Sequence, residues 1–441
     1  MIAVAILLSG FSTPRLVQLQ SIHTTERNLS DPTSPQQILY LTFDGVLEPL
    51  GRSQVIGYLT GLANQGFSYT LLSLERDRDL ANQDLLAETE DLLAGHGIKW
   101  IRLPYRQGGA KLVFENIRIM TREALNLIRA RPVGLIHARA HVTAAIACYL
   151  RFRSRTPYLF DARGYWIDEK AAEGAWFTSS TSYKIAKLIE RCMFRHASGI
   201  VTLTRLMADD VRSGTLHHDD RIPIAVIPTC TDFAKFRRDP ALTLPIPEAN
   251  KARLAGKLVI GMMGAINASY YSKEALHLFR LLRGLREDAH LLWVTRQSDV
   301  ARILTRDAHI SDCDVTIVES THQDMPMWLN RMDWGFLLLQ ETLAKRGSVP
   351  TKLAEMLACE VRPIHYGCNS EIAAIVRDAG SGISLHDLSK DCLERSARHI
   401  AFFPSESETL AFGRRYSETL FSLESGVRKY EALIREVLDR R

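Results

Sequence analysis

The stretch Ser348-Val-Pro-Thr-Lys-Leu-Ala-Glu-Met-Leu-Ala-Cys-Glu-Val-Arg-Pro-Ile-His365 decides the fold of this chain. Pro350 has a backbone angle suited to the first turn of a helix, and Ser348 offers a hydroxyl to the unpaired amides of that turn. A helix is therefore expected to begin here, followed by a buried strand, Val361–His365. The open N–H groups and the positive end of the helix dipole form a seat for an anion such as a diphosphate.

The side chains of this helix divide into two groups. Thr351 and Glu355 lie one turn apart on one face, where a carboxylate can accept hydrogen bonds from the vicinal hydroxyls of a ribose. The same spacing would also let Lys352 and Glu355 form an ordinary surface ion pair. An apolar flank, suited to packing against a sheet, consists of Leu353, Met356 and Leu357.

The segment Pro350-Thr-Lys-x-x-Glu-x-Leu-Ala resembles the donor-nucleotide helix of retaining glycosyltransferases with the two-lobed GT-B fold. These enzymes form the large family 4 or group 1 type that elongates bacterial polysaccharides and lipopolysaccharides. The resemblance implies that Glu355 binds the ribose of a nucleotide-sugar, since it matches the second acid of the family's Glu-x7-Glu pair. Gly347 stands in the place of the first acid, which leaves the orientation of the donor sugar open.

Size and composition indicate an ordinary globular protein with two domains. The 441 residues exceed what one hydrophobic core organises, and 46% of them are hydrophobic and 24% charged. The mild formal charge of +5 suits anionic substrates or a peripheral membrane contact and does not indicate nucleic acid. The seven cysteines are scattered, without a C-x-x-C pair, so we expect neither a disulfide framework nor a zinc site. A reducing cytoplasm fits them.

Residues 1–37 are predicted to form a poorly ordered extension. Ile2–Leu8 is apolar, but it has no basic flank and is too short to span a bilayer. A cleaved signal peptide or a membrane anchor is the alternative interpretation. No later segment approaches the roughly 18 uninterrupted apolar residues of a transmembrane helix, so none is expected.

Residues 38–236 are predicted to form a Rossmann-like lobe that holds the acceptor. Short apolar runs alternate with amphipathic ones, which indicates right-handed βαβ units and a parallel sheet. The expected strands are Ile38–Phe43, Tyr69–Leu74, Ile98–Leu103, Gly134–His137 and Tyr158–Phe160.

Ligands of such sheets lie beyond the carboxyl ends of the strands, so the loops that leave those ends are candidate sites. Gly51, after the first strand, would let the backbone approach a phosphate or an acceptor, although a plain turn explains it nearly as well. After the fourth strand come His137, Arg139 and His141. In the family a histidine leaving this strand lies close to the reacting sugar. The resemblance points to His137, with His141 as a rival, while a core or surface histidine is the default for either.

The loop after the fifth strand carries the strongest signal in this lobe. Arg163 offers a permanently charged fork for anions, and Trp166, Asp168 and Glu169 supply a stacking ring and carboxylates, a mixture that suits sugars. A tryptophan packed in the core, with charges facing water, is the alternative. The runs Leu-Gly-Arg-Ser-Gln, His-Ala-Arg and Phe-Asp-Ala-Arg-Gly-Tyr-Trp-x-Asp-Glu resemble acceptor-side motifs of the same family. We therefore predict catalytic roles for two of these residues and acceptor contacts for the others: His137 and Arg163, then Gly51, Arg139, Trp166, Asp168 and Glu169.

The remaining chain is predicted to form a linker over 237–257, a nucleotide-sugar lobe over 258–422 and a helix over 423–441 that packs back toward the first lobe. The resemblance implies that basic and polar residues after the first two strands of the second lobe hold the diphosphate. Arg296 leaves a strand's carboxyl end and is the better candidate for phosphate, whereas Lys273 could as easily be a solvated first-turn residue. The predicted donor-binding residues are Glu355, Lys352, Thr351, Ser348, Arg296, Asn267 and Lys273.

The predicted activity is transfer of a sugar from a nucleoside diphosphate sugar to a hydroxyl of a glycan or lipid-linked acceptor, with retention implied by the resemblance. No cofactor and no metal are expected: Asp77-Arg-Asp79 and Asp312-Cys-Asp314 look like D-x-D metal sites, but the first sits in a charged loop that leads into a helix and the second at the start of a strand. Two alternatives stay open, since a fold does not fix a reaction. One is a nucleotide-sugar epimerase or hydrolase, and the other is a non-catalytic nucleotide-sugar-binding partner subunit.

Overall fold

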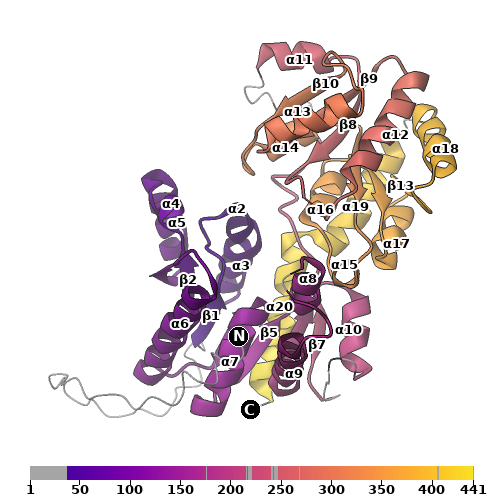
Figure 1. Ribbon diagram of the computed structural model, residues 1–441. Helices are drawn as coiled ribbons and strands as arrows, with labels where there is room; N and C mark the ends of the chain where they lie inside the picture. Colours follow the sequence, from indigo (N-terminus) through magenta and orange to yellow (C-terminus); the bar gives the residue numbers. More distant parts are fainter. Residues whose placement is uncertain are drawn as a thin grey trace. The chain divides into compact units, whose positions relative to one another are not determined.

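The computed structural model divides into two compact units, each built on its own β-sheet (Figure 1). The structure describes residues 37–174, 176–214, 216, 221–239, 242, 247–267, 269–404 and 407–440. Among these, the first unit takes 37–202, 208–225 and the end of the chain from Lys429, and the second takes 203–207 and 226–428. The extension predicted for residues 1–37 lies outside the described residues, apart from Gln37.

The first unit contains a seven-stranded sheet in the order β3-β2-β1-β4-β5-β6-β7, and the pairs from β3 to β6 are parallel. The order reverses beside β1, so the carboxyl ends of β1 and β4 flank the switch point where ligands of such sheets bind. The strands are β1 Gln37–Thr42, β2 Ser68–Glu75, β3 Lys99–Pro104, β4 Leu135–Arg139, β5 Tyr158–Asp161, β6 Gly199–Thr202 and β7 Ile224–Val226.

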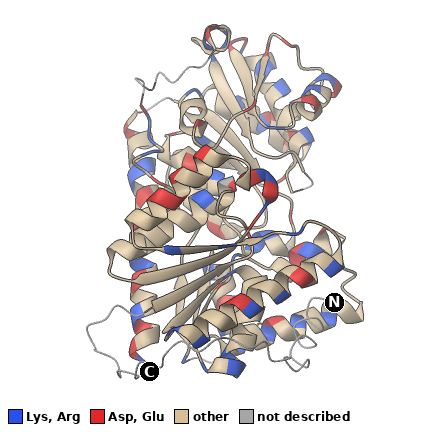
Figure 2. Ribbon diagram, turned by 90° about the vertical axis from the view of Figure 1, so that its left-hand side faces the viewer, with Lys and Arg blue, Asp and Glu red and all other residues tan. Residues whose placement is uncertain are grey.

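Helices lie on both faces of this sheet, as Figure 2 shows. The chain steps outward from β1 to β3 and then returns through β4, β5 and β6, so right-handed crossovers place the two sets of helices on opposite faces. The outward set is α2 Pro49–Gly51, η1 Arg52–Ile56, α3 Gly57–Asn64, α4 Asp77–Leu80 and α5 Gln83–Gly95. The return set is α6 Ala110–Ala130, α7 Ala140–Ser154, α8 Trp166–Ala172 and α9 Thr181–His196, followed after β6 by α10 Arg205–Arg212.

The second unit contains a six-stranded sheet in the order β10-β9-β8-β11-β12-β13. Its strands are β8 Leu258–Met263, β9 Ala289–Val294, β10 Val315–Val318, β11 Trp334–Leu338, β12 Arg362–Tyr366 and β13 Ile383–Ser384. Its helices are α11 Glu248–Leu254, α12 Ser272–Leu285, α13 Ser298–Asp307, α14 Met325–Leu329, α15 Leu343–Arg346, α16 Thr351–Ala358, α17 Ser370–Asp378, α18 Lys390–Ala401, α19 Ser407–Phe421 and α20 Leu423–Asp439. The residues of α20 from Lys429 belong to the first unit.

Two apolar clusters pack the second sheet, one including α16 and the other including α12 and α18. Glycine in the middle of two central strands makes room for methionine: a Cβ at Gly261 would meet Met332, and one at Gly335 would meet Met356. The apolar flank predicted for the organising helix is confirmed, because Leu353, Met356 and Leu357 lie in the α16 cluster.

The predicted fold class, two parallel-sheet α/β lobes, is confirmed. The range predicted as a linker, 237–257, contains helix α11, while 240–241 and 243–246 lie outside the described residues. Two other local expectations were wrong. Residues predicted as a loop after β5 form the first turns of α8. Strand β4 continues to Arg139, so His137 lies inside it rather than leaving it.

Candidate active site

Helix α16 begins one residue later than the sequence predicts. Pro350 is its N-cap, with an extended backbone (φ −64°, ψ 136°), and Thr351 is the first helical residue. Ser348 does not cap the helix: its hydroxyl points back to the carbonyl of Lys345 at 3.5 Å. No side chain of the described residues caps the amino end of α16, so the amides of its first turn remain free of side-chain acceptors there. This is the arrangement in which a helix N-terminus can receive an anion.

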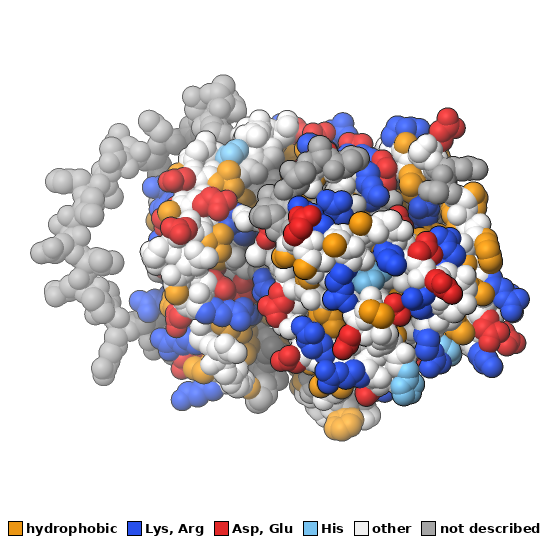
Figure 3. Space-filling view, turned by 90° about the horizontal axis from the view of Figure 1, so that it is seen from above, with side chains coloured by type: hydrophobic (Ala, Val, Ile, Leu, Met, Phe, Trp, Pro, Cys, Tyr) orange, Lys and Arg blue, Asp and Glu red, His pale blue; other side chains and the backbone are white. Residues whose placement is uncertain are grey.

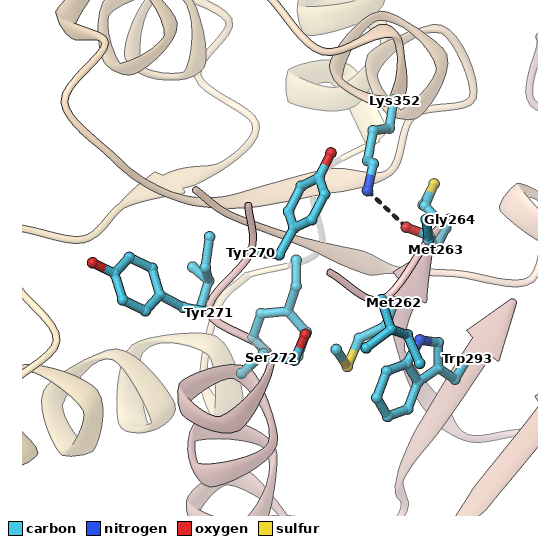
Figure 4. Close-up of a pocket in the computed structure, with 13 residues that line it drawn as sticks. Met262, Met263, Gly264, Tyr270, Tyr271, Ser272, Trp293 and Lys352 are labelled. Carbon is cyan, nitrogen blue, oxygen red and sulfur yellow. Dashed lines mark hydrogen bonds between the residues drawn. The ribbon is translucent and has the colours of Figure 1, made fainter. Parts of the chain in front are cut away.

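Lys352 joins this helix end to the carboxyl end of β8 (Figure 4). Its Nζ donates a hydrogen bond of 2.7 Å to the Met263 carbonyl and lies 3.8 Å from the ring centroid of Tyr270. A Cβ at Gly264, whose φ is +91°, would lie 3.3 Å from the same Nζ. A pocket lies here, lined by Lys352, Tyr270 and Gly264 together with Met262, Ile266, Ser272 and Trp293. No carboxylate pairs with Lys352 among the described residues, so its charge faces this pocket without a counter-ion.

The carboxylate of Glu355 is buried, with 6% of the residue exposed. Its Oε1 lies 2.8 Å from Nε2 of His322, whose ring also contacts Phe236 at a centroid distance of 5.5 Å. Oε2 has no hydrogen-bond partner within the described part of the chain. His322 could not be predicted as the partner of Glu355, because it lies 33 residues away along the chain, in the turn before α14.

The other predicted donor residues separate into two places. Asn267 and Arg296 are exposed in the loops after β8 and β9, and Asn267 accepts the amide of Ser269 at 2.9 Å. Gln297, which sequence reasoning missed, ties these loops together: its Oε1 accepts the Ile266 amide at 2.7 Å. Lys273 instead lines a second cavity between α12 and α13, so the structure does not bring it together with Lys352.

In the first unit, the loop between β1 and α2 is held by a buried carboxylate that the sequence did not reveal. Glu75, at the end of β2, accepts the amides of Val46 at 2.9 Å and Leu47 at 3.3 Å. Burial raises the pKa of this carboxyl. Gly51 is required here because a Cβ would collide with the backbone of Gly45 and Val46. The glycine therefore allows two backbone segments to touch.

Two arginines share one carboxylate at the carboxyl ends of β4 and β5. The parallel register sets Arg139 opposite Asp161, with Nη1 and Oδ2 3.8 Å apart. Arg163 lies 3.4 Å from the other oxygen of Asp161 and 3.3 Å from the amide oxygen of Gln54. Nε and Nη1 of Arg139 are buried without a hydrogen bond in the described residues. The group carries a net positive charge, and Ala140 next to it has a left-handed backbone (φ +66°), a strained conformation for a non-glycine residue.

His137 lies behind this group in the core of the first unit. Only 1% of it is exposed, and its ring packs against Tyr40 at 4.5 Å and Tyr430 at 5.3 Å. Neither ring nitrogen has a hydrogen-bond partner in the part of the chain that the structure describes. Burial lowers the pKa of His137 to about 4, so the ring is neutral at physiological pH.

The aromatic and acidic residues of α8 face a buried network rather than one open surface. Asp168 accepts the hydroxyl of Tyr183 at 2.6 Å and Nζ of Lys187 at 3.0 Å. Trp166 stacks on His141, with ring centroids 6.0 Å apart, and is half-buried, as is Glu169. His141 lies 3.0 Å from Oε1 of the buried Glu190, which makes it a satisfied core histidine.

Two kinds of feature are absent from the residues that the structure describes. No group of three or more His, Cys, Asp or Glu side chains there is arranged to hold a metal ion. No helix there combines the length and apolar character needed to cross a bilayer.

Residues 54–230 match the glycosyl transferase 4-like domain family. The matched range covers most of the first unit, including β4, β5 and the shared carboxylate of Asp161. No curated protein matches the whole sequence closely enough to be counted as a relative.

Solved structures resemble the chain along most of its length. A glycosyltransferase from Rickettsia africae has a TM-score of 0.65 and 14% identity, covering 92% of this chain and 100% of its own. Sucrose-phosphate synthase from Thermosynechococcus elongatus (TM-score 0.64, 14% identity) and Anabaena HepE in complex with UDP and glucose (0.64, 12%) cover the same shares. This likeness shows the GT-B fold of glycosyltransferases. With the domain match, it supports sugar transfer as the general activity.

Proposed function

We propose that this protein is a glycosyltransferase that moves a sugar from a nucleoside diphosphate sugar to a hydroxyl of a glycan or lipid-linked acceptor. The observation that carries the proposal is the seat formed by Lys352, Gly264 and the uncapped end of α16. It lies at the carboxyl end of β8, where ligands of parallel sheets bind. HepE, which has the same fold, was solved with UDP and glucose.

The seat suits a diphosphate for three reasons. The amides of α16 carry the positive end of the helix dipole, Lys352 adds a full charge, and glycine at position 264 lets the phosphate approach the backbone. Arg296, exposed after the neighbouring strand β9, would add a second cation. These groups would stabilise the negative charge that develops on the leaving diphosphate in the transition state. Stabilisation of that charge lowers the activation barrier for transfer.

Glu355 is the proposed ribose ligand. Its Oε1 is occupied by His322 at 2.8 Å, and Oε2 is the oxygen that a ribose hydroxyl would approach. His322 would then orient the carboxylate. Thr351, the half-buried first residue of the same helix, would contact the phosphates.

In the first unit, we propose that Arg139 and Arg163 position the acceptor. Their shared partner, Asp161, balances only one of the two positive charges. An electronegative group of the acceptor would interact with the remaining charge. Retention of the anomeric configuration, with a donor phosphate oxygen taking the acceptor's proton, and independence of metals and cofactors are proposed on the resemblance of the Pro350–Ala358 segment. A cytoplasmic location is proposed from the free thiols of all seven cysteines.

The proposal is tested in two steps. A thermal-shift screen with UDP, GDP, ADP, CMP and their sugars identifies the donor, since a ligand that binds only the folded state raises Tm. Release of the nucleoside diphosphate is then followed with and without a panel of acceptors. Release that requires an acceptor supports transfer. Release without one indicates a hydrolase, interconversion of the sugar without release indicates an epimerase, and binding without turnover indicates a partner subunit.

A further inference from the structure

Two cysteines face each other between α7 and α9, which pack against one another in the first unit. Sγ of Cys148 lies 3.9 Å from Sγ of Cys192, and both residues are free thiols. A disulfide bond is about 2.0 Å long, so the two sulfur atoms need to approach by only about 1.9 Å to form one. Rotation of the two side chains and a small shift of one helix can cover that distance.

Contacts on both sides hold the two thiols together. Toward the start of α7, Nε2 of His141 lies 3.0 Å from Oε1 of Glu190 on α9. Toward its end, the ring of Phe152 lies 4.9 Å from that of His196. These contacts follow one another in the same order along both helices, with the cysteines between them. The packing of α7 on α9 therefore keeps the two sulfur atoms close.

The two thiols differ in their access to solvent. Cys148 is buried, with 6% of the residue exposed, whereas Cys192 is half-buried. Charges of both signs are mixed on the face shown in Figure 3, but the exposed charged residues nearest to Cys192 along α9 are both cations, Arg191 and Arg195. Positive surroundings favour the thiolate, which is the reactive form of a cysteine. A dissolved oxidant would therefore react with Cys192 first.

The hydrogen bond between the thiols distinguishes them further. It lowers the pKa of Cys192, an effect to which the charge of Arg195 adds. The same hydrogen bond, together with burial, raises the pKa of Cys148. The pair thus consists of a reactive thiolate and a protonated thiol that lies within reach of the oxidised product.

Other cysteines of the chain have different surroundings. Cys359 is buried, and burial raises the pKa of its thiol to about 12. Burial also raises the pKa of Cys368. Cys313 is exposed, and its Sγ lies 3.1 Å from Oγ of Ser311 and 3.6 Å from Oδ1 of Asp314. It is therefore an accessible thiol in contact with oxygen atoms, which makes it a suitable control.

We propose that Cys148 and Cys192 form a modification site at which hydrogen peroxide converts the two thiols into a disulfide that joins α7 to α9. The Cys192 thiolate attacks a peroxide oxygen, the O–O bond breaks, and the hydroxide that leaves takes a proton from water. The Cys148 sulfur then attacks the sulfenic sulfur of Cys192 and the S–O bond breaks. The second hydroxide leaves as water with the proton of the Cys148 thiol, so the two thiols are oxidised and the peroxide is reduced.

The disulfide would be reversible and transient in a reducing compartment. A small thiol such as glutathione attacks one sulfur of the bond and restores both cysteines by exchange. Disulfides of this kind in the cytosol report oxidation rather than hold a fold together. The modification is independent of the proposed sugar transfer, since it needs neither donor nor acceptor.

Peptide mapping of the full-length protein tests the proposal. Trypsin places the two cysteines in different peptides, residues 140–151 and 192–195, so a disulfide between them gives one cross-linked species that dithiothreitol separates. The native protein is treated with hydrogen peroxide, its remaining thiols are blocked with iodoacetamide, and the digest is analysed by mass spectrometry. The variants are Cys148→Ser and Cys192→Ser, and the matched control, Cys313→Ser, removes an exposed thiol of the second unit. Circular dichroism and Tm confirm that each variant is folded.

The wild type and the control should form the cross-link within one chain, and both serine variants should lack it. In Cys148→Ser, the oxidised Cys192 should remain a sulfenic acid that dimedone traps, whereas the buried Cys148 should stay reduced in Cys192→Ser. Three results would overturn the proposal: no cross-link in the wild type, a cross-link of Cys192 to another cysteine or a second chain, or a cross-link that forms only after unfolding in urea. The wild type alone gives this decision if a serine variant does not fold.

Discussion

Lys352 and Met263 are 89 residues apart, yet a hydrogen bond of 2.7 Å from Nζ to the carbonyl oxygen joins them across the candidate donor pocket. The bond fixes the amino end of α16 beside the carboxyl end of β8. Because the lysine donates to a neutral carbonyl and lies over the ring of Tyr270, it keeps its full charge for a ligand.

Replacing this lysine should weaken donor binding more than it weakens the fold. Lys352→Gln removes a charge-assisted hydrogen bond to the diphosphate, worth about 1.5–3 kcal/mol, so the Kd for the nucleotide should rise at least about tenfold. Isothermal titration calorimetry measures it. Lys390→Gln is the control, since Lys390 is an exposed cation of the same unit, near Glu394 on α18. Equal Kd values for the nucleotide in the two variants would show that Lys352 does not bind the donor.

Gly264 is expected to be intolerant of a side chain. Its φ of +91° is unfavourable for other residues, and a Cβ would lie 3.3 Å from Nζ of Lys352. Gly264→Ala should therefore cost about 1–2 kcal/mol of unfolding free energy and displace the lysine, lowering donor affinity as well. Gly284→Ala provides the contrast: it lies in helix α12 with no atom within 4 Å of its Cβ position, and alanine should raise Tm. Denaturant unfolding of both variants measures the two changes in unfolding free energy, which should have opposite signs.

Glu355 should act on the ribose and on no other part of the donor. Glu355→Gln is expected to lower the affinity for the nucleotide chosen by the screen but to have little effect on the affinity for its 2′,3′-dideoxy analogue. The difference between the two losses isolates the hydroxyl contacts, as in a double-mutant cycle. If both ligands lose affinity equally, the carboxylate only supports His322, its neighbour at 2.8 Å.

His137 links stability to pH. Burial lowers its pKa from 6.5 to about 4, so between these values the unfolded chain binds a proton that the folded protein does not. Stability should therefore fall as the pH decreases through this window, by at most about 1.4 kcal/mol per pH unit from this group. Phenylalanine at position 137 should reduce that slope without abolishing it, since burial also lowers the pKa values of His290 and His365 to about 4.

The same variant, His137→Phe, also tests catalysis. Both ring nitrogens lack partners in the described structure, so an apolar ring of similar size should leave the fold intact. Loss of turnover in a folded variant would support the predicted role near the sugar. Unchanged turnover would make His137 a core residue, as its contacts with Tyr40 and Tyr430 already allow.

Hydrophobic periodicity was sufficient to predict the alternating elements, because strands and helices differ in the spacing of buried side chains. It also placed Leu353, Met356 and Leu357 in the core. The site was less predictable, since spacing along the chain does not show which loops meet. Arg139 and Asp161 pair because the β4–β5 register sets them opposite each other. Glu75, His322 and Gln297 carry no local signal, because their partners lie about 30 residues away.

The position of a bound donor tests the account most directly. A crystal structure of the protein with the nucleotide-sugar chosen by the thermal-shift screen would show where the diphosphate lies. We expect its oxygens within hydrogen-bonding distance of Lys352 Nζ and the first amides of α16, with the ribose on Glu355. A well-ordered nucleotide bound elsewhere, with Lys352 still on the Met263 carbonyl and Glu355 still paired only with His322, would contradict the account.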